Sequence, residues 1–168
     1  PATDMAVALA IASSASDTPL PSGLVAFGEI GLAGDVRPIS SLERRLAEAV
    51  ESIQRETGLQ DVYGLLCDVS QEDQVQVLVN AADTQLGGID VLVNNAGLGT
   101  SRRVVDMDDA EWHKVIDVTL TGTFRMMRAA LKVMQPRGKG VIINNASVLG
   151  WRAQVEQAHY AAAKAGVM

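Results

Sequence analysis

Apolar positions recur with two different periods from about residue 40 to the end of the chain. Short apolar runs predict buried strands, at 62–67, 89–93 and 141–145. Apolar residues at every third or fourth position predict helices, at 40–57, 70–86, 109–134 and from about Ala158 onward. Strands that alternate with helices in this way are typical of an open, doubly wound sheet with parallel strands.

The first forty residues follow a less regular pattern. They predict an apolar helix, a short strand and a hairpin around Gly34-Asp35, at 2–13, 24–27, and 29–33 with 36–39. The expected fold class is therefore α/β, with a three-layer, mostly parallel, doubly wound (Rossmann-like) sheet. We expect this sheet to be incomplete and to follow an irregular α+β N-terminal segment.

Two of the predicted helices have clear inner faces, and glycines mark helix ends at Gly58 and Gly87. Ser70 is the expected N-cap of the helix at 70–86. The residues expected to face the core from this helix are Val75, Leu78, Ala82 and Leu86. The residues expected to face the core from the helix at 109–134 are Trp112, Val115, Ile116, Phe124, Met127 and Leu131.

Composition narrows the class of protein. The chain has 168 residues, 48% of them apolar and 20% charged, as expected for one globular domain. Polar residues interrupt every long apolar run, so we expect no membrane-spanning segment. The net charge of -6 argues against a nucleic-acid surface that binds phosphates. Cys67 is the only cysteine and has no internal disulfide partner, so we expect a buried, inert thiol in a cytoplasmic protein.

Tyr160, Lys164 and Ser147 form a candidate catalytic group. Residues four apart share one face of a helix, so Tyr160 and Lys164 should point the same way. An ammonium close to a phenol favours the ionised phenolate, which suits proton exchange with a carbonyl or an alcohol. Ser147 follows a predicted strand, at the sheet edge where such folds bind ligands, and its hydroxyl could hold the substrate oxygen.

Each of these signals has an ordinary structural explanation when taken alone. A Tyr-x-x-x-Lys spacing is common on amphipathic helices, and a serine after a strand is usually a turn residue or a helix cap. Asn94-Asn95-Ala96-Gly97 could be a plain turn after a strand. Their order along the chain, each after a strand of a predicted parallel sheet, favours a shared function.

In this order the motifs resemble the short-chain dehydrogenase/reductase family, over about residues 45–168. The resemblance implies NAD or NADP as cofactor and hydride transfer to or from a small alcohol, ketone or acyl-carrier substrate. It also implies a homodimer formed through the helix at 109–134 and its neighbour. It assigns catalysis to Ser147, Tyr160 and Lys164. It assigns cofactor binding to Asp68, Val69, Asn94, Asn95, Ala96 and Gly97, together with Tyr160 and Lys164, which would hold the nicotinamide ribose.

The sequence departs from the family pattern in three ways. Thr119 stands where the family has a fourth catalytic residue, an asparagine. The pattern also ends at Met168, before the family's Pro-Gly loop and substrate lid. The opening strand and its phosphate-binding Thr-Gly-x-x-x-Gly-x-Gly loop are not recognisable. The glycines at 28–34 have different spacing and enclose an acid, Glu29, which would repel a pyrophosphate.

Residues 1–47 instead resemble the carboxyl-terminal, Lon-protease-like domain of the bacterial RadA/Sms DNA-repair proteins. In that alignment Ala2 and Glu43 occupy the positions of the protease Ser and Lys, so a peptidase has neither nucleophile nor base here. The two resemblances predict a truncated chimera with domains at 1–47 and 48–168.

Three functions follow from the sequence. The first is an NAD(P)-dependent oxidoreductase with Tyr160 as general acid and base, although weak or absent cofactor binding is compatible with the departures. The second is a catalytically silent α/β scaffold without the phosphate loop. The third is a DNA-repair-associated module, against which the acidic charge counts.

Overall fold

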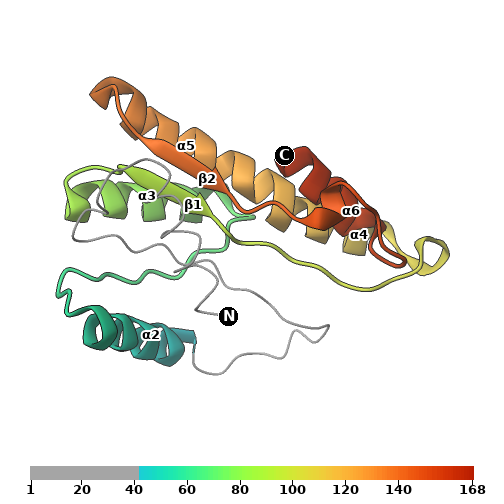
Figure 1. The fold of residues 1–168 in the computed structure, drawn as a ribbon, viewed down its shortest axis with the longest axis horizontal. Helices are drawn as coiled ribbons and strands as arrows, with labels where there is room; N and C mark the ends of the chain where they lie inside the picture. Colours follow the sequence, from blue (N-terminus) through green and yellow to red (C-terminus); the bar gives the residue numbers. More distant parts are fainter. Residues whose placement is uncertain (1–41) are drawn as a thin grey trace.

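The structure, a computed structural model, describes residues 42–168 (Figure 1). The helix, strand and hairpin predicted before residue 40 lie outside this range. The elements in chain order are α2 (Leu42–Thr57), α3 (Glu72–Leu86), β1 (Val91–Asn94), the 3-10 turn η1 (Val104–Asp106), α4 (Asp109–Ile116), the π-helical turn η2 (Asp117–Thr121), α5 (Gly122–Arg137), β2 (Val141–Asn144), the 3-10 turn η3 (Val148–Gly150) and α6 (Ala158–Val167). None of the helices in this range is long and apolar enough to cross a membrane.

The strands β1 and β2 form a parallel pair, in register from Val91 opposite Val141 to Asn94 opposite Asn144. The chain passes from one to the other through α4 and α5, because parallel neighbours need a long crossover. A parallel pair joined by a helical crossover is the repeating unit of a doubly wound α/β fold. Both polypeptide strands therefore end at the same edge, where the polar motifs follow.

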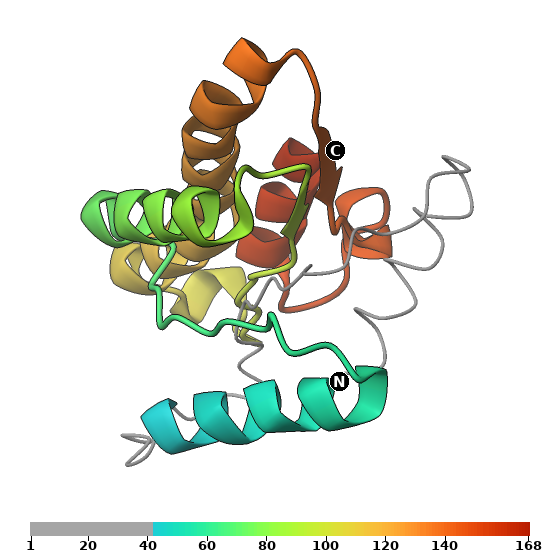
Figure 2. The same cartoon turned by 90° about the vertical axis from the view of Figure 1, so that its left-hand side faces the viewer.

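The core lies between α3, β1 and α5, which the two ribbon views show close together (Figures 1 and 2). The buried residues that form it are Val75, Val79, Ile89, Leu92, Ala129, Ala130 and Met134. Small alanines on α5 allow this helix to approach β1 closely, and valines of α3 fill the space between them. α6 packs on the other end of the helical crossover, against α4, η2 and η3.

Residues 62–67 were predicted to form a strand, and this prediction is wrong. Within the described range the structure has no strand there, and Leu65 and Leu66 are 42% and 45% exposed. A strand requires a neighbour for its backbone hydrogen bonds. Among the described residues β1 pairs only with β2, so the segment 62–67 has no ladder to join. Only Val62 of this run is buried.

The predicted long helix is divided in two by the π-helical turn η2. A π turn inserts an extra residue, so the apolar faces of α4 and α5 no longer follow one continuous period. Three residues expected in the core are exposed instead, Trp112 at 37%, Phe124 at 50% and Leu131 at 39%. Val115 is fully buried as predicted.

The helix ends follow local rules with one correction. Gly58 and Gly87 have φ angles of 73° and 68° and stand just after α2 and α3, as predicted. The N-cap of α3 is Gln71 rather than Ser70, because the Asp68 carboxylate accepts the Ser70 N–H at 2.9 Å and forms a turn first. α4 begins at a capping carboxylate, since Asp108 Oδ1 accepts the Glu111 N–H at 2.8 Å.

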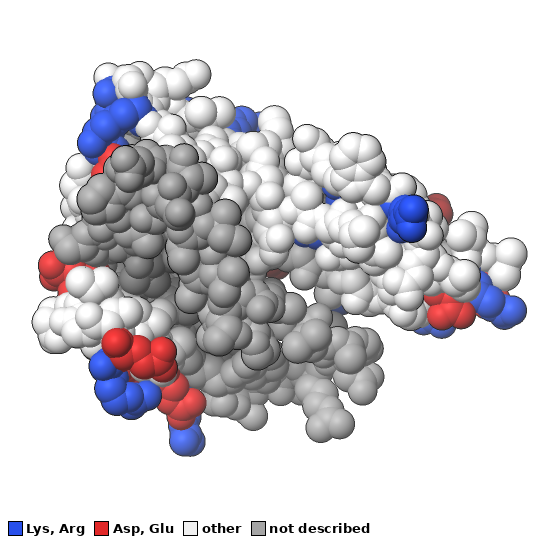
Figure 3. Space-filling view, viewed as in Figure 1, with Lys and Arg blue, Asp and Glu red and all other residues white. Residues whose placement is uncertain are grey.

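Charged side chains of both signs lie over α2 on the face in Figure 3, while the described surface near α6 carries few charges there. The described part of this face has no extended patch of a single sign. The described residues on that face therefore form no basic surface that could bind phosphates, as expected from the net charge of -6.

Candidate active site

Four asparagines join the two loops that follow β1 and β2. Asn94 Nδ2 donates to Asn144 Oδ1 at 2.9 Å, and one residue further on Asn145 Nδ2 donates to Asn95 Oδ1 at 2.6 Å. The backbone continues the ladder, because the Asn145 N–H donates to the Asn94 carbonyl at 2.9 Å. Paired side-chain amides satisfy each other's polar groups at a half-buried edge. The result is a layer of four hydrogen-bonded asparagines at the carboxyl ends of the strands.

Lys164 lies beside these asparagines. It comes from α6, is 4% exposed, and its Nζ donates to the Asn145 carbonyl oxygen at 2.5 Å. Burial lowers the pKa of the Lys164 ammonium below its ordinary value. A Cβ added to Gly97 would lie 3.6 Å from Lys164 Nζ, so the loop after β1 passes close to the ammonium.

Tyr160 lies one turn before Lys164 on the same face of α6, as the spacing predicted. Lys164 Nζ is 5.7 Å from the centre of the Tyr160 ring. The same loop lies against the ring, because a Cβ added to Gly99 would be 3.3 Å from Tyr160 Cδ2. The structure therefore brings Tyr160, Lys164 and the segment 94–99 together.

Ser147 stands at the N-cap of η3, in the short loop that follows β2. Its Oγ accepts the Leu149 N–H at 3.2 Å, which is the ordinary capping role anticipated for a serine here. The hydroxyl proton is still free to be donated, because that capping bond uses Oγ as acceptor only. η3 packs closely on α6, since a Cβ at Gly150 would lie 3.0 Å from the Lys164 carbonyl carbon.

Thr119 lies within the π-helical turn η2 and is completely buried. Its Oγ1 accepts the Leu98 N–H at 3.0 Å and donates to the Leu98 carbonyl at 3.2 Å. One hydroxyl thus satisfies both backbone groups of a loop residue. Thr119 ties the segment that contains Gly97 and Gly99 to the helical crossover.

Asp68 and Val69 divide between two environments. Val69 lines a small cavity of about 30 Å³ together with Asn94, Asn95 and Ala96. It also contacts α5 closely, because a Cβ at Gly122 would lie 2.7 Å from Val69 Cγ2. The Asp68 side chain is exposed and accepts the Ser70 N–H. Val69 therefore joins the predicted cofactor residues in one recess, and Asp68 stands beside it.

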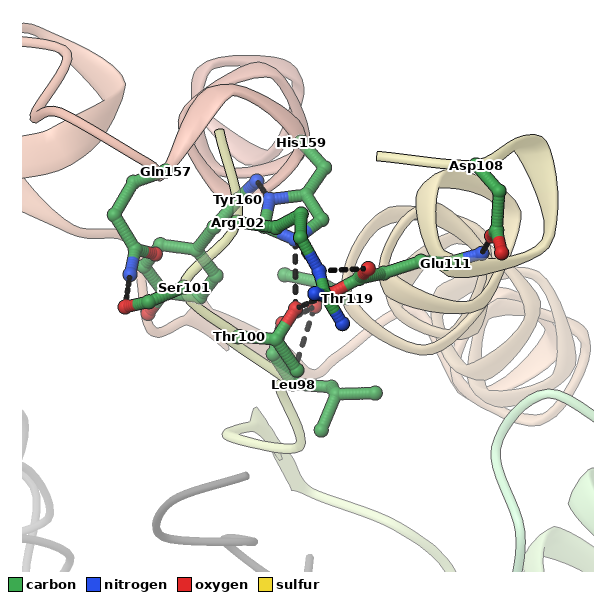
Figure 4. Close-up of polar contacts among 10 residues, drawn as sticks. All are labelled: Leu98, Thr100, Ser101, Arg102, Asp108, Glu111, Thr119, Gln157, His159 and Tyr160. Atoms are coloured by element: carbon green, nitrogen blue, oxygen red, sulfur yellow. Dashed lines mark hydrogen bonds and ion pairs between the residues drawn. The ribbon is translucent and has the colours of Figure 1, made fainter. Parts of the chain in front are cut away.

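A polar network that joins residues far apart in the sequence lies next to Tyr160 (Figure 4). Thr100 Oγ1 is 2.7 Å from Nε2 of the fully buried His159 and donates to Glu111 Oε1 at 2.8 Å. Arg102 Nε donates to the other Glu111 oxygen at 3.0 Å. The hydrogen bond from Thr100 is the main cause that lowers the pKa of the Glu111 carboxyl, and burial lowers the pKa of His159. The adjacency of His159 and Tyr160 was the only signal in the sequence.

Comparison with known proteins decides the family. The family model described as short chain dehydrogenase matches residues 33–168. The chain belongs to the short-chain dehydrogenase family. The match begins at residue 33, so it includes part of the range 1–47 in which a second resemblance was noted. That second resemblance, to the RadA/Sms proteins, stays a prediction.

Two curated relatives illustrate the range of this family. The chain is 54% identical over 128 residues to a (5R,7aS)-5-hydroxy-7a-methyl-1-oxo-2,3,5,6,7,7a-hexahydro-1H-indene-carboxyl-CoA reductase of Mycobacterium tuberculosis, covering 75% of this chain and 48% of the relative. It is 37% identical over 105 residues to the 3-oxoacyl-[acyl-carrier-protein] reductase FabG of Vibrio cholerae, covering 62% of this chain and 43% of the relative. The chain spans about half the length of the curated relatives it matches.

Solved structures confirm the predicted fold class. A short chain dehydrogenase from Mycobacterium smegmatis superposes with a TM-score of 0.69 at 52% identity, covering 74% of this chain and 52% of that one. An actinorhodin polyketide ketoreductase variant, solved with NADPH, superposes with a TM-score of 0.70 at 37% identity, covering 74% of this chain and 48% of that one. The fold is therefore of the Rossmann-like α/β class, and proteins of this family use NAD(P).

Proposed function

We propose that this chain carries the proton-transfer half of an NAD(P)-dependent oxidoreductase site, with Tyr160 as general acid and base. The observation that supports it best is the buried Lys164 ammonium, held on the Asn145 carbonyl beside the Tyr160 ring and the Asn94–Gly97 loop. Burying an ammonium costs free energy unless it is paired or hydrogen-bonded, and buried ionisable groups concentrate at functional sites.

The roles of the three side chains follow from their chemistry. In the reducing direction the Tyr160 hydroxyl donates its proton to the substrate carbonyl oxygen, and the nearby Lys164 ammonium stabilises the phenolate that remains. The Ser147 hydroxyl donates a hydrogen bond to the same oxygen. A bound nicotinamide supplies the hydride, because no side chain can. In the oxidising direction the Tyr160 phenolate takes the alcohol proton.

The residues present fit such a cofactor. The Lys164 ammonium has three N–H donors, and one of them donates to the Asn145 carbonyl, so the other two can bind ribose hydroxyls. Gly97 keeps the loop free of a side chain next to that ammonium. Asn94, Asn95, Ala96 and Val69 lie together at the carboxyl end of β1, where open α/β sheets bind ligands, and we assign them to the border of the cofactor site, with Asp68 beside them.

The substrate that we propose is a ketone or alcohol carried on a thioester. Both curated relatives named above act on thioester carriers according to their names, a carboxyl-CoA and an acyl-carrier protein. In this chain Trp151 and Val155 lie between Ser147 and Tyr160 and are 82% and 84% exposed. These apolar side chains would gain by covering an apolar acyl or ring group.

The experiment is thermal unfolding of the purified chain with and without millimolar NADH or NADPH. A ligand that binds only the folded chain raises its stability by RT ln(1 + [L]/Kd), which is about 2.7 kcal/mol at a hundredfold excess over Kd. We expect a higher Tm with one of the two cofactors and turnover of a 3-oxoacyl thioester. Tyr160→Phe should abolish turnover, while Tyr63→Phe, on the exposed segment before α3, should retain it. Equal turnover in both variants would remove Tyr160 from the mechanism.

One observation favours the second candidate, a silent scaffold. The Thr119 hydroxyl donates its one proton to the Leu98 carbonyl, so Thr119 has no proton to give to a water-mediated relay of the kind an asparagine supports in the family. Thr119→Asn should raise turnover if this relay limits the rate. An unshifted Tm with either cofactor would select the scaffold.

We also propose a homodimer through α4 and α5. Trp112, Phe124 and Leu131 are exposed on these helices, and aromatic side chains such as the first two are enriched at interfaces. Light scattering at assay concentration should give twice the chain mass, and a monomer would contradict the proposal. A domain boundary at residue 47, the origin of residues 1–47 and a cytoplasmic location rest on the sequence alone.

A further inference from the structure

We infer that His159 is a positioning residue for Tyr160, acting through a buried chain of hydrogen bonds to Thr100 and Glu111. The inference rests on the proposed function, because it concerns the placement of the proposed acid and base. It adds residues outside the Ser147, Tyr160 and Lys164 group. Figure 4 shows His159 reaching from α6 toward Thr100, with Glu111 approaching the same hydroxyl from α4.

The two ends of this series of hydrogen bonds determine which group donates in each bond. The Tyr160 backbone N–H donates to His159 Nδ1 at 2.9 Å, so Nδ1 carries no proton. The neutral ring then holds its proton on Nε2, which donates to Thr100 Oγ1 at 2.7 Å. The Thr100 hydroxyl in turn donates to Glu111 Oε1 at 2.8 Å. A carboxylate accepts only, so it fixes the order of donors along the whole chain.

The bond to Tyr160 satisfies a helix terminus. The first backbone N–H groups of a helix have no partner within it. Gln157, at the N-cap of α6, makes no capping bond with its side chain, and its carbonyl accepts only from Ala161 among the described contacts of this turn. The His159 ring therefore supplies the acceptor that the Tyr160 N–H needs. This couples the backbone of Tyr160 to the orientation of the ring.

Thr100 and Glu111, at the other end of this series of hydrogen bonds, fix the position of the His159 ring. His159 is completely buried, so its ring has one available orientation while Thr100 and Glu111 hold it. Thr100 directly follows the segment 94–99 that lies against Tyr160 and Lys164. Glu111 is fixed at the start of α4 by its own N–H on Asp108 and by Arg102. The network thus fixes the position of α6 relative to the loop and to α4. This matters for Tyr160 because small displacements of a reacting group have large kinetic effects.

Two substitutions separate the links of this chain. Thr100→Val keeps the side-chain shape and removes the hydroxyl that joins His159 to Glu111. His159→Asn keeps an acceptor near the Nδ1 position for the Tyr160 N–H but cannot reach Thr100. The matched controls are Thr84→Val, a threonine on the exposed face of α3, and His113→Asn, the second histidine, exposed on α4.

Steady-state kinetics with NADPH and a 3-oxoacyl thioester tests the inference. We expect Thr100→Val and His159→Asn to lower kcat about tenfold with the KM for NADPH within about twofold of the wild type. The controls should leave both constants unchanged. An active wild type whose kcat survives both substitutions would overturn the inference and leave the proposed function intact. A wild type without cofactor binding or turnover would overturn both.

Nitrogen-15 NMR of the imidazoles adds a readout that does not depend on turnover. The chain has two histidines, so the His113→Asn variant reports His159 alone. We expect the Nε2–H tautomer at neutral pH, and a changed Nε2 signal when Thr100→Val is added. A His159 protonated on Nδ1, or mixed tautomers, would contradict the proton order and with it the positioning role.

Discussion

Thr119→Val isolates the contact that holds the loop after β1. Valine has nearly the shape of threonine, so the substitution removes the two hydrogen bonds to Leu98 without opening a cavity. Thr119 is fully buried, and both bonds are partly shielded from water. The perturbation therefore acts on the backbone polar groups of Leu98 rather than on packing.

The magnitude follows from the groups left behind. A typical hydrogen bond contributes about 1 kcal/mol to stability, and a buried group left without its partner costs about 1 to 3 kcal/mol. Two backbone groups lose a partner here, and the partial exposure of Leu98 lets water replace some of the loss. We expect the free energy of unfolding to fall by roughly 2 to 3 kcal/mol, out of a total of about 5 to 15 kcal/mol for an ordinary domain.

The assay is urea unfolding followed by circular dichroism. The control is Thr84→Val, whose hydroxyl donates to the Asn80 carbonyl on an exposed face, and which should change stability by less than about 0.5 kcal/mol. A Thr119→Val chain as stable as the control would refute the view that Thr119 anchors the loop. A loss of secondary structure without denaturant would exceed the estimate and would point to a larger role of the π turn.

Three further predictions concern ionisable groups. Lys164→Met should leave a folded chain that no longer gains Tm with NAD(P)H, whereas Lys114→Met on exposed α4 should respond as the wild type does. Burial holds the pKa of His159 below the ordinary 6.5. Its contribution to stability is therefore present above pH 6.5 and is lost as the pH falls through the pKa of the folded state. The difference in unfolding free energy between wild type and His159→Asn should shrink from pH 7.5 to pH 5. Burial, with help from Asp68 and Asp73, raises the pKa of Cys67, so iodoacetamide should alkylate it more slowly than free cysteine at pH 8; equal rates would contradict a shielded thiol.

Local sequence rules predicted the parts of the fold that depend on few neighbours. The start of α6 at Ala158 and the helix end at Gly58 follow from helix periodicity and from the left-handed conformation that glycine adopts readily. The pairing of Tyr160 with Lys164 on one face follows from a spacing of four residues.

Other features depend on tertiary contacts that no local pattern contains. The π turn at Asp117–Thr121 changes which residues of the crossover face inward, and periodicity alone placed Phe124 in the core. The segment 62–67 has strand composition but no partner strand within the described range. His159 and Thr100 are 59 residues apart in sequence, so their contact appears only in the fold.

The asparagine motifs show both sides of this relation. The sequence placed Asn94 and Asn95 at the end of a strand next to a cofactor site, and the structure places them at the end of β1. Their amides also bind Asn144 and Asn145 across the sheet edge. This second role needs the register of two parallel strands, which the sequence does not specify.

Hydride transfer itself is the central claim, and isotope transfer measures it most directly. The chain would be incubated with a 3-oxoacyl thioester and NADPH deuterated at both C4 positions, and the product analysed by mass spectrometry. We expect one deuterium on the new alcohol carbon with the wild type, and none with Tyr160→Phe. Unlabelled substrate recovered from the wild type, under conditions where the chain is folded, would contradict it.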